Sequence, residues 1–269
     1  MSYNISTRTK LSVQRLEPRR LMAGDVSAFF AAGRFPFLDN LVVEGDQQAN
    51  EIRVVEDGTG GATIEGLNGT TVNGLPVVTI QSESGYIVHS LVELGNGDDV
   101  LIYELSNNQS ASHGTEIHTG NGDDEVTIGA AGALGTLRIE TGVGDDRVVF
   151  ELADSALLQA LDIDTGNGDD EVLFQADAAG SSLIALRHIR IDTGRGNDTV
   201  RFQGSLAVTN DKSFAVWLGS GDDQLIGDPG NSLEVEELNV FGEKGVDKVF
   251  GDSHFLSDNI SLVDFEEYH

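Results

Sequence analysis

Cysteine is absent from this chain of 269 residues, and proline, aromatic and basic residues are all scarce. Without cysteine there are no disulfide bonds and no thiol chemistry, although secretion is still allowed because a bound cation can also cross-link a fold. The chain has 16 lysines and arginines but 45 aspartates and glutamates. The resulting formal net charge of −29 disfavours nucleic acid and anionic membranes as partners. No apolar run approaches the roughly 20 residues of a transmembrane helix, so we expect none.

Glycine is abundant by contrast, and many of the 33 glycines belong to one repeated turn. Residues 163–174, with the sequence IDTGNGDDEVLF, give the clearest copy. Seven copies are found, and their final acidic positions are Asp99, Asp124, Asp146, Asp170, Asp198, Asp223 and Asp247. They recur every 22–28 residues, which is the period of a solenoid.

Apolar residues stand at fixed offsets on each side of this turn. Seven residues before each final aspartate the sequence has a β-branched residue, and two residues after it an aliphatic one: Val92, Ile117, Ile139, Ile163, Ile191, Val216 and Val240, then Leu101, Val126, Val148, Val172, Val200, Leu225 and Val249. This pattern predicts strand, turn, strand in every repeat. Because such a pair has one apolar face, it must stack on its neighbours. We therefore expect an all-β fold, a right-handed parallel β-helix of about nine coils.

The expected organisation places this β-helix at residues 41–254, with the acidic coils over 91–251. A short N-terminal cap is expected over 25–40, including a helix from Asp25 to Ala32 with Asp25 as its N-cap. Asn50 precedes Asp99 by 49 residues, about two periods, so one degenerate coil around residues 64–72 is expected between them. Residues 255–269 are expected to cap the far end. Segments between the copies, such as Leu157 and Ile184, would supply a third side of each coil.

The N-terminal segment has the opposite charge from the rest. Residues 1–20 contain five basic residues and one acid, so they carry +4 and the remainder carries −33. Leu16–Met22 resembles the LEPR-x-L-L N-terminal motif of large repetitive surface or secreted proteins of planctomycete-type bacteria. The resemblance implies that residues 1–24 are a targeting segment and that the protein is exported. A disordered basic tail is the alternative, since no apolar signal-peptide core follows the basic residues.

The turn itself resembles the calcium-binding nonapeptide of repeats-in-toxin proteins, G-G-x-G-x-D-x-U-x. On that pattern Gly166, Gly168, Asp170 and Val172 take the second glycine, the third glycine, the aspartate and the apolar position. Thr165 departs from the pattern at the first glycine, where a left-handed backbone would be strained by a β-branched residue. The resemblance implies that carboxylates and turn carbonyls of adjacent coils hold Ca²⁺, a cation that takes six to eight oxygen ligands.

The predicted calcium ligands are the acids at the last two positions of the turns. They are Asp98, Asp99, Asp123, Asp124, Asp145, Asp146, Asp169, Asp170, Asp198, Asp222, Asp223 and Asp247. Carboxylates stacked ~5 Å apart repel by roughly 1 kcal/mol per pair in water, so such a ladder needs a counter-ion. Two alternatives stay open: the turns use these residues only for their turn propensity, or the ladder is uncharged because it is protonated.

Two other functions compete with a structural one. Polysaccharide lyases and hydrolases also use β-helices, but they need two or three acids, or an acid with Arg and His, in one cleft. The most site-like group is Arg187, His188 and Arg190, for which a solvated strand edge is the simpler explanation. A threonine column formed by Thr119, Thr141, Thr165 and Thr193 resembles ice-binding surfaces, although its outward neighbours are charged and irregular.

The sequence therefore predicts a secreted or cell-surface, non-catalytic, calcium-binding repeat protein with a structural or adhesive role. Its expected partners are calcium ions and extracellular polysaccharide or other surface proteins.

Overall fold

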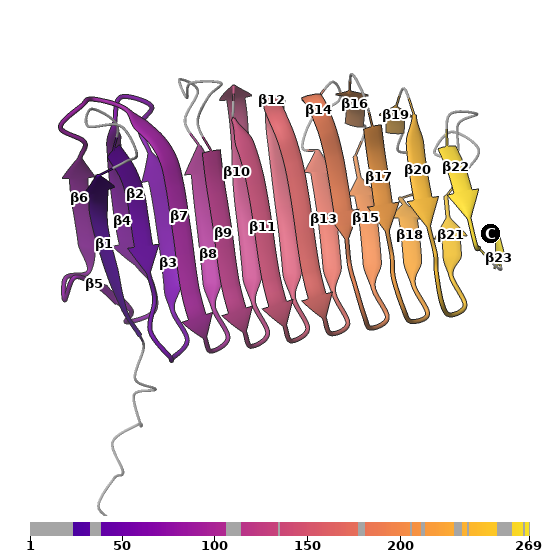
Figure 1. Cartoon of the computed structure of the whole chain (residues 1–269), viewed down its shortest axis with the longest axis horizontal. Helices are drawn as coiled ribbons and strands as arrows, with labels where there is room; N and C mark the ends of the chain where they lie inside the picture. The colour runs from indigo at the N-terminus through magenta and orange to yellow at the C-terminus, as the bar shows by residue number, and fades with distance from the viewer. Residues whose placement is uncertain are drawn as a thin grey trace, which may run out of the picture.

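A computed structural model describes residues 24–32, 39–105, 114–133, 135–176, 181–204, 206–210, 213–228, 233–235, 237–251, 260–265 and 267–268. Over these ranges the chain forms 23 strands and no helix, so nothing in them could cross a membrane as a helix. The strands stack side by side into an elongated parallel β-solenoid, and from β7 to β23 the chain advances along its axis (Figure 1). This confirms the predicted all-β solenoid.

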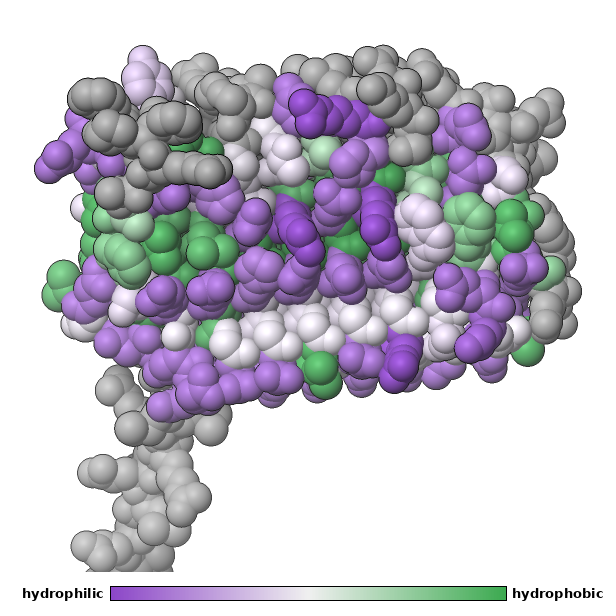
Figure 2. Space-filling model, viewed as in Figure 1, coloured by the Kyte–Doolittle hydropathy of each residue, from purple (hydrophilic) through white to green (hydrophobic). Residues whose placement is uncertain are grey.

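The strand before each turn belongs to one ladder, which we call the first ladder. Its members, each parallel to the next, are β2 (Asp39–Glu44), β7 (Ile87–Asn96), β9 (Gly114–Asn121), β11 (Thr136–Val143), the C-terminal part of β12 (Arg147–Asn167), β14 (Ser181–Asp192), β17 (Ser213–Trp217), β20 (Leu238–Phe241) and β22 (Ile260–Val263). Its outward side chains form one broad face of the molecule (Figure 2).

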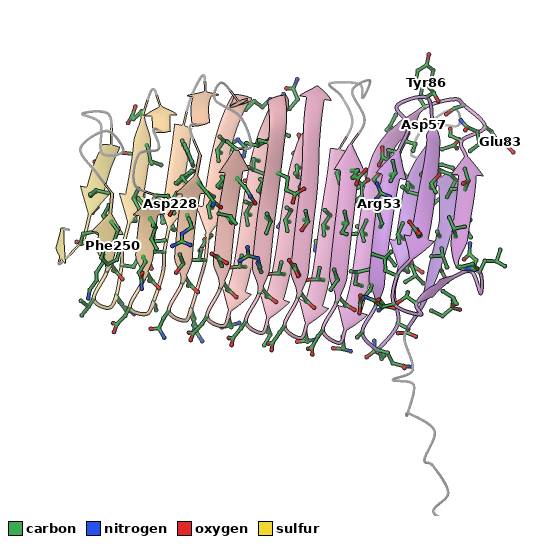
Figure 3. All side chains as sticks on the ribbon, turned by 180° about the vertical axis from the view of Figure 1, so that it is seen from behind. Arg53, Asp57, Glu83, Tyr86, Asp228 and Phe250 are labelled. Carbon is green, nitrogen blue, oxygen red and sulfur yellow. The ribbon has the colours of Figure 1, made fainter. Side chains whose placement is uncertain are left out.

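The strand after each turn belongs to a second parallel ladder. It contains β3 (Glu51–Glu56), β8 (Val100–Leu105), β10 (Glu125–Ala133), the N-terminal part of β12, β13 (Glu171–Ala176), β15 (Thr199–Gln203), β18 (Gln224–Gly227), β21 (Lys248–Phe250) and β23 (Glu267–Tyr268). Figure 3 shows the molecule from behind, with Arg53 of β3 towards one end and Phe250 of β21 towards the other. Each Gly-Asp turn joins the two ladders.

A third side is described in part. Pairings of β12 with β14, β14 with β16 (Leu206–Asn210) and β16 with β19 (Leu233–Val235) bring together the inter-repeat segments that were expected there. Several connections that would complete the coils, such as residues 106–113 and 177–180, lie outside the described residues. The number of complete coils and their handedness therefore stay predictions.

The two predicted apolar columns lie in the core, together with further residues such as Leu137, Leu161 and Ile189. Ile139, Ile163 and Ile191 pair in register and are 2% exposed or less, and every other member of both columns is 0% exposed. Beyond the second column, Phe150, Phe174 and Phe202 stack with ring centroids 5.0 and 5.2 Å apart. The alternation of apolar and polar residues along each strand therefore fixed which side chains fill the interior.

The prediction of a degenerate coil around residues 64–72 is wrong. The strand β3 pairs directly with β8, so Asn50 lies one level from Asp99 and not two. The intervening chain instead folds back as an antiparallel meander of β3, β4 (Gly61–Gly66) and β6 (Val77–Gln81), with the short β5 (Thr71–Val72) beside it. Asp57 accepts hydrogen bonds from the backbone N–H groups of Thr59 and Gly61, and this tight turn reverses the chain.

The prediction of an N-terminal helix is also wrong, because Asp25–Ala32 forms strand β1. It pairs antiparallel with β2 and parallel with β5. Val26 and Ala28 are buried while Asp25 and Ser27 are exposed, which is the alternation of a strand over an apolar edge. Residues 25–32 of the predicted cap therefore form a strand, and the cap itself stays a prediction. Residues 1–23, with the basic segment, and Phe35 and Phe37 lie outside the described residues.

At the C-terminal end the described part of residues 255–269 continues the ladders. The strand β22 pairs with β20 and β23 pairs with β21, both in parallel. Leu262 and Phe265 are partly buried against the core, so the stacking continues into this segment. Phe255 and Leu256, which were expected in the same cap, lie outside the described residues.

Candidate functional site

The repeated turn depends on glycine at two positions. In the 165–170 copy, Gly166 has φ of 97° and Gly168 has φ of 141°, values that favour glycine. A Cβ added at Gly168 would lie 1.8 Å from the carbonyl oxygen of Gly144 in the adjacent coil. Thr165 has no positive φ, so the departure from the nonapeptide at this position causes no backbone strain.

The final aspartates of the turns point into the molecule. All seven, from Asp99 to Asp247, are 2% exposed or less. In each pair of adjacent coils the backbone N–H of one aspartate donates to Oδ1 of the aspartate in the following coil, as from Asp146 to Asp170 at 2.8 Å. The chain of such bonds begins at Asn50, whose N–H donates to Asp99, and ends at Asp247. We call these residues the buried column.

The second carboxyl oxygen in this column is buried too. Oδ2 has no hydrogen-bond partner in Asp99, Asp124, Asp146, Asp170, Asp198 and Asp223. A charged oxygen left in this state is costly, because it is shielded from solvent and the nearby threonine hydroxyl, as in Thr165 beside Asp170, donates instead to a backbone carbonyl. Among the residues that the structure describes, these oxygens are the clearest sign that the six aspartates differ from ordinary, solvated carboxylates.

The penultimate position forms a second, exposed column of hydrogen bonds with the opposite direction. Here the backbone N–H of the following coil donates back to the preceding carboxylate, as from Asp169 to Asp145 at 2.8 Å. The acceptors are Asp98, Asp123, Asp145, Asp169, Asn197 and Asp222. All six are exposed. Each turn is therefore joined to both neighbours by a side chain.

The threonine column lies inside the solenoid. Thr119, Thr141, Thr165 and Thr193 are 0% exposed, and each hydroxyl donates to a backbone carbonyl of the following coil, at 2.9 to 3.2 Å. Leu94 and Leu218 occupy the same position and are equally buried. The resemblance to an ice-binding surface is therefore wrong, because such a surface must present its threonines to solvent.

Burial shifts the ionisation of the buried column. Burial raises the pKa of Asp99, Asp146, Asp198 and Asp223 from 3.8 to about 7. It also raises the pKa of Asp124 and Asp170. The backbone N–H bonds oppose this shift, and repulsion from neighbouring aspartates adds to it. Burial thus makes these aspartates easier to protonate than ordinary carboxyl groups.

The predicted calcium ligands therefore separate into two sets. In the buried column one oxygen of each aspartate accepts a backbone N–H, and the second oxygen of six of them has no hydrogen-bond partner. In the described part of the chain no three His, Asp or Glu side chains converge as they would around a metal ion, so a calcium ion would also need turn carbonyls as ligands. The exposed column is open to solvent, and calcium binding stays a prediction for both columns.

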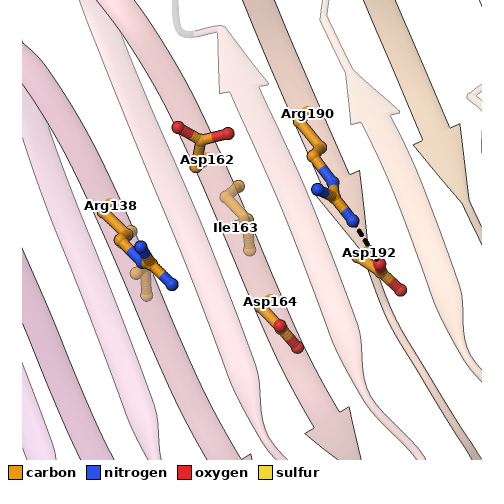
Figure 4. Close-up of a pocket in the computed structure, with 7 residues that line it drawn as sticks. Arg138, Asp162, Ile163, Asp164, Arg190 and Asp192 are labelled. Atoms are coloured by element: carbon orange, nitrogen blue, oxygen red, sulfur yellow. Dashed lines mark hydrogen bonds and ion pairs between the residues drawn. The ribbon is translucent and has the colours of Figure 1, made fainter.

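A second polar group lies on the outer face of the first ladder. Arg138, Asp162, Asp164, Arg190 and Asp192 line a shallow groove above the buried Ile139 and Ile163 (Figure 4). The predicted group of Arg187, His188 and Arg190 contributes two members to this face. His188 Nε2 lies 3.0 Å from Asp162 Oδ1, and Arg190 pairs with Asp192 at 2.9 Å and lies over the ring of Trp217.

Sequence reasoning missed a buried polar group inside the solenoid. Glu56 is 0% exposed, and its Oε1 accepts hydrogen bonds from Ser90 Oγ at 2.5 Å and from the Tyr103 hydroxyl. The alternation along β3 places Glu56 inward with Ile52 and Val54, so this signal was present in the sequence. No groove reaches these residues among those described, and their role is structural.

No known family, curated protein or solved structure matches the chain. Its function must therefore be inferred from the two turn columns and the outer face.

Proposed function

We propose that this protein is a non-catalytic structural module, exported to the cell surface or the extracellular matrix, where a stiff β-solenoid serves as an adhesive or scaffolding element. The single observation that carries this proposal is the use of the acids. The buried column commits one aspartate per turn to bonds between coils, and the exposed column commits a second. Repetition of one residue along the axis serves stacking, whereas catalysis needs a local cluster.

Export is supported by the resemblance of Leu16–Met22 to the LEPR-x-L-L motif. The high negative charge also favours solubility, because copies of the protein repel one another. The test is fractionation of cells that express the full chain with a C-terminal tag. Recovery in the medium or on protease-accessible cell surface supports the proposal, and recovery only in the cytoplasm contradicts it.

A polysaccharide-active enzyme is the second candidate, and the groove on the first ladder favours it. Three aspartates and two arginines are gathered there, which is the kind of cluster that catalysis needs. Incubation of the protein with neutral and acidic polysaccharides, followed by assays for new reducing ends and for unsaturated products, separates the two candidates. Cleavage that is lost in Asp164→Ala would replace the structural proposal with the enzymatic one.

Calcium binding is retained as a proposal for the acids of the turns. Titration calorimetry with calcium on the full chain should then give heat that Asp169→Asn reduces if the ions lie at the exposed column. Asp170→Asn should reduce the heat instead if the ions lie at the buried column, so the two variants distinguish the columns. Absence of heat, with equal melting temperatures in calcium and in chelator, would reject calcium altogether.

A further inference from the structure

The second ladder is extended at its N-terminal end by two antiparallel strands. The strand β4 pairs with β3 and β6 pairs with β4, so β6 is the outermost strand on this side of the molecule (Figure 1). Within the described ranges β6 pairs with no other strand. We call the side of β6 that faces away from β4 the free edge.

The backbone groups at the free edge follow from the pairing of β6 with β4. The N–H of Ser82 donates to the carbonyl of Gly60, and the carbonyl of Pro76 accepts from Gly66, so the even-numbered positions face β4. Because the direction alternates along a strand, the N–H and C=O groups of the odd-numbered positions face the free edge. These positions are Val77, Thr79 and Gln81.

The corresponding edge of the first ladder is covered. Asp25 and Val26 of β1 pair with β5. Beyond them the Asn73 side chain accepts from the Ala28 N–H at 3.1 Å and donates to the Ala28 carbonyl at 2.9 Å, as a further strand would. In the part of the chain that the structure describes, β6 has no such cover.

The sequence of β6 does not protect its free edge. Residues 66–82 contain no charged residue, although 23% of the whole chain is charged. Edge strands of soluble proteins usually carry charges or proline that prevent pairing with other chains. Pro76 precedes β6, but its position faces β4, so its missing N–H leaves the free edge intact. Leu75 is 54% exposed and Val77 is 47% exposed, so apolar surface adjoins the unpaired backbone.

The strand β6 is complementary to itself. In an antiparallel pair centred on Thr79, Val78 lies opposite Ile80 of the second copy, and Val77 lies opposite Gln81. Val78 and Ile80 are partly buried, whereas the three odd-numbered residues are exposed, so residues of the same face meet across the pair. The same register pairs every backbone group at the free edge.

Charge favours this end of the solenoid for contact between copies. Each copy carries −29, so most surfaces would bring carboxylates together. At the C-terminal end, β22 and β23 also have one pairing strand each among the described residues. Asp264 directly follows β22 and Glu267 lies in β23, so two copies that met there would repel each other. The uncharged β6 avoids this repulsion.

We propose that β6 pairs antiparallel with β6 of a second copy and joins two solenoids end to end at their N-terminal ends. The second ladder would then continue from one copy into the other, and both C-terminal ends would point outward. Such a dimer would form whether or not the protein is exported or binds calcium.

Mass and length are measured first on the full chain. Light scattering after gel filtration should give twice the 28.6 kDa of one chain. Small-angle X-ray scattering should give a maximum dimension close to twice that of the monomer, because the copies meet at their ends. Higher salt should strengthen the dimer, since it screens the repulsion between the two acidic copies.

Thr79→Lys tests the pairing strand. It places two positive charges opposite each other at the centre of the pair, so we expect the dissociation constant of the dimer to rise at least tenfold. Thr63→Lys is the matched control. Thr63 lies opposite Thr79 on β4, one strand in from the free edge, and either substitution removes the 3.1 Å hydrogen bond between the two hydroxyl groups. The control should stay dimeric, and circular dichroism verifies that both variants fold.

Thr79→Cys tests the register without adding charge. The chain has no cysteine, so any disulfide bond formed under mild oxidation must join two copies at this position. The two Cα atoms would be about 5.5 Å apart, a separation that a disulfide bond spans. We expect a covalent dimer from Thr79→Cys and none from Thr63→Cys.

The outcomes are distinct. Monomers at every concentration and salt would overturn the dimer and indicate that β6 is free for a strand of another protein. A dimer of unchanged length, or one that Thr79→Lys leaves intact while Thr79→Cys forms no disulfide bond, would place the contact elsewhere and also overturn the proposal. A lengthened dimer that Thr79→Lys separates and Thr79→Cys cross-links supports it. None of these results depends on the cellular location that tests the proposed function.

Discussion

At the scale of the residue, the most informative position is the final one of the turn, because its side chain is an acid in seven copies and is buried in all of them. The first member of the same column is Asn50, whose amide Nδ2 donates to Asp99 Oδ1 at 3.2 Å. A neutral amide therefore fits the column. An aspartic acid that is protonated on Oδ2 also has one acceptor and one donor, as an amide does. The hydroxyl of Thr165 lies beside the carboxyl group of Asp170 in the same turn.

Substitution of Asp170 tests this equivalence. Asp170→Asn keeps an acceptor for the Asp146 N–H, so we expect its free energy of unfolding at pH 6 to lie within about 1 kcal/mol of the unchanged protein. Asp170→Ala leaves that buried N–H without an acceptor and should cost about 1–3 kcal/mol. The measurement is urea unfolding, with the exposed Asp169→Asn as control. A large loss in Asp170→Asn would show that the negative charge itself is needed.

The pH dependence of stability follows from the same column. Folding raises the pKa of Asp146 and Asp198 from 3.8 to about 7, so the folded state holds protons that the unfolded state releases. This contribution is complete below the unfolded pKa and is lost as the pH rises through about 7. We expect the melting temperature to fall as the pH rises from about 4 to about 7 and to level off above that range. Asp170→Asn removes one titrating group, so its decline should be smaller, and a flat profile would argue against protonation.

At low pH other groups set the limit. A hydrogen bond from the Ser82 hydroxyl lowers the pKa of Asp39, so its contribution is present above the ordinary carboxyl pKa and is lost as the pH falls. Maximum stability is therefore expected in mildly acidic solution, between these two transitions.

At the scale of the element, the turn is what lets two strands stack at one spacing. The carbonyl of Gly144 approaches Gly168 so closely that no side chain fits between the coils. Thr165 faces inward by the same alternation that places Ile163 inward and Asp164 outward, and the left-handed glycines that follow it turn the chain towards Asp170. The strands thus pair as in other parallel sheets, and the turn determines the distance between coils.

Glycine substitutions distinguish the turn from the strand. Gly168→Ala introduces both a clash at 1.8 Å and a strained φ of 141°, so we expect a loss of more than about 2 kcal/mol. Gly129→Ala is the matched control, since its new Cβ would lie 3.3 Å from the flexible Glu104 side chain at an ordinary φ, and its effect should stay within about 1 kcal/mol. Equal losses in thermal unfolding would contradict the proposed role of the turn.

At the scale of the whole molecule, stability is approximately a sum of coils and of contacts between neighbouring coils. The core columns run the length of the described solenoid, and no second core lies beside them in that part of the chain. Damage to one coil should therefore spread to its neighbours and weaken with distance along the axis.

Ile163→Asp measures this spread. The substitution buries an unpaired charge at a position that is 2% exposed, which should cost several kcal/mol. Hydrogen exchange should increase most in β11, β12 and β14 and least in β2 and β22. Asp164→Asn, on the outward side of the same strand, should change exchange little. Uniform loss of protection would mean that the solenoid unfolds as one unit.

The sequence by itself determined the repeat, the positions of the turns and the two apolar columns, because these depend on spacing along the chain. Ile163 faces inward and Asp164 outward through the two-residue period of a strand, whatever lies beside it. The period likewise required stacking, since a single coil has no way to cover its own apolar face.

Only the tertiary structure decided the chemistry of the turns and the shape of the N-terminal end. Asp170 and Thr165 are polar, and nothing local fixes whether the next coil will cover them; their burial follows from the close approach of Gly168 to Gly144. Asp25–Ala32 is strand because β2 and β5 offer it edges to pair with, and residues 61–81 reverse into a meander because β3 already pairs with β8. Hydrogen-bond partners supplied from distant parts of the chain override local propensity.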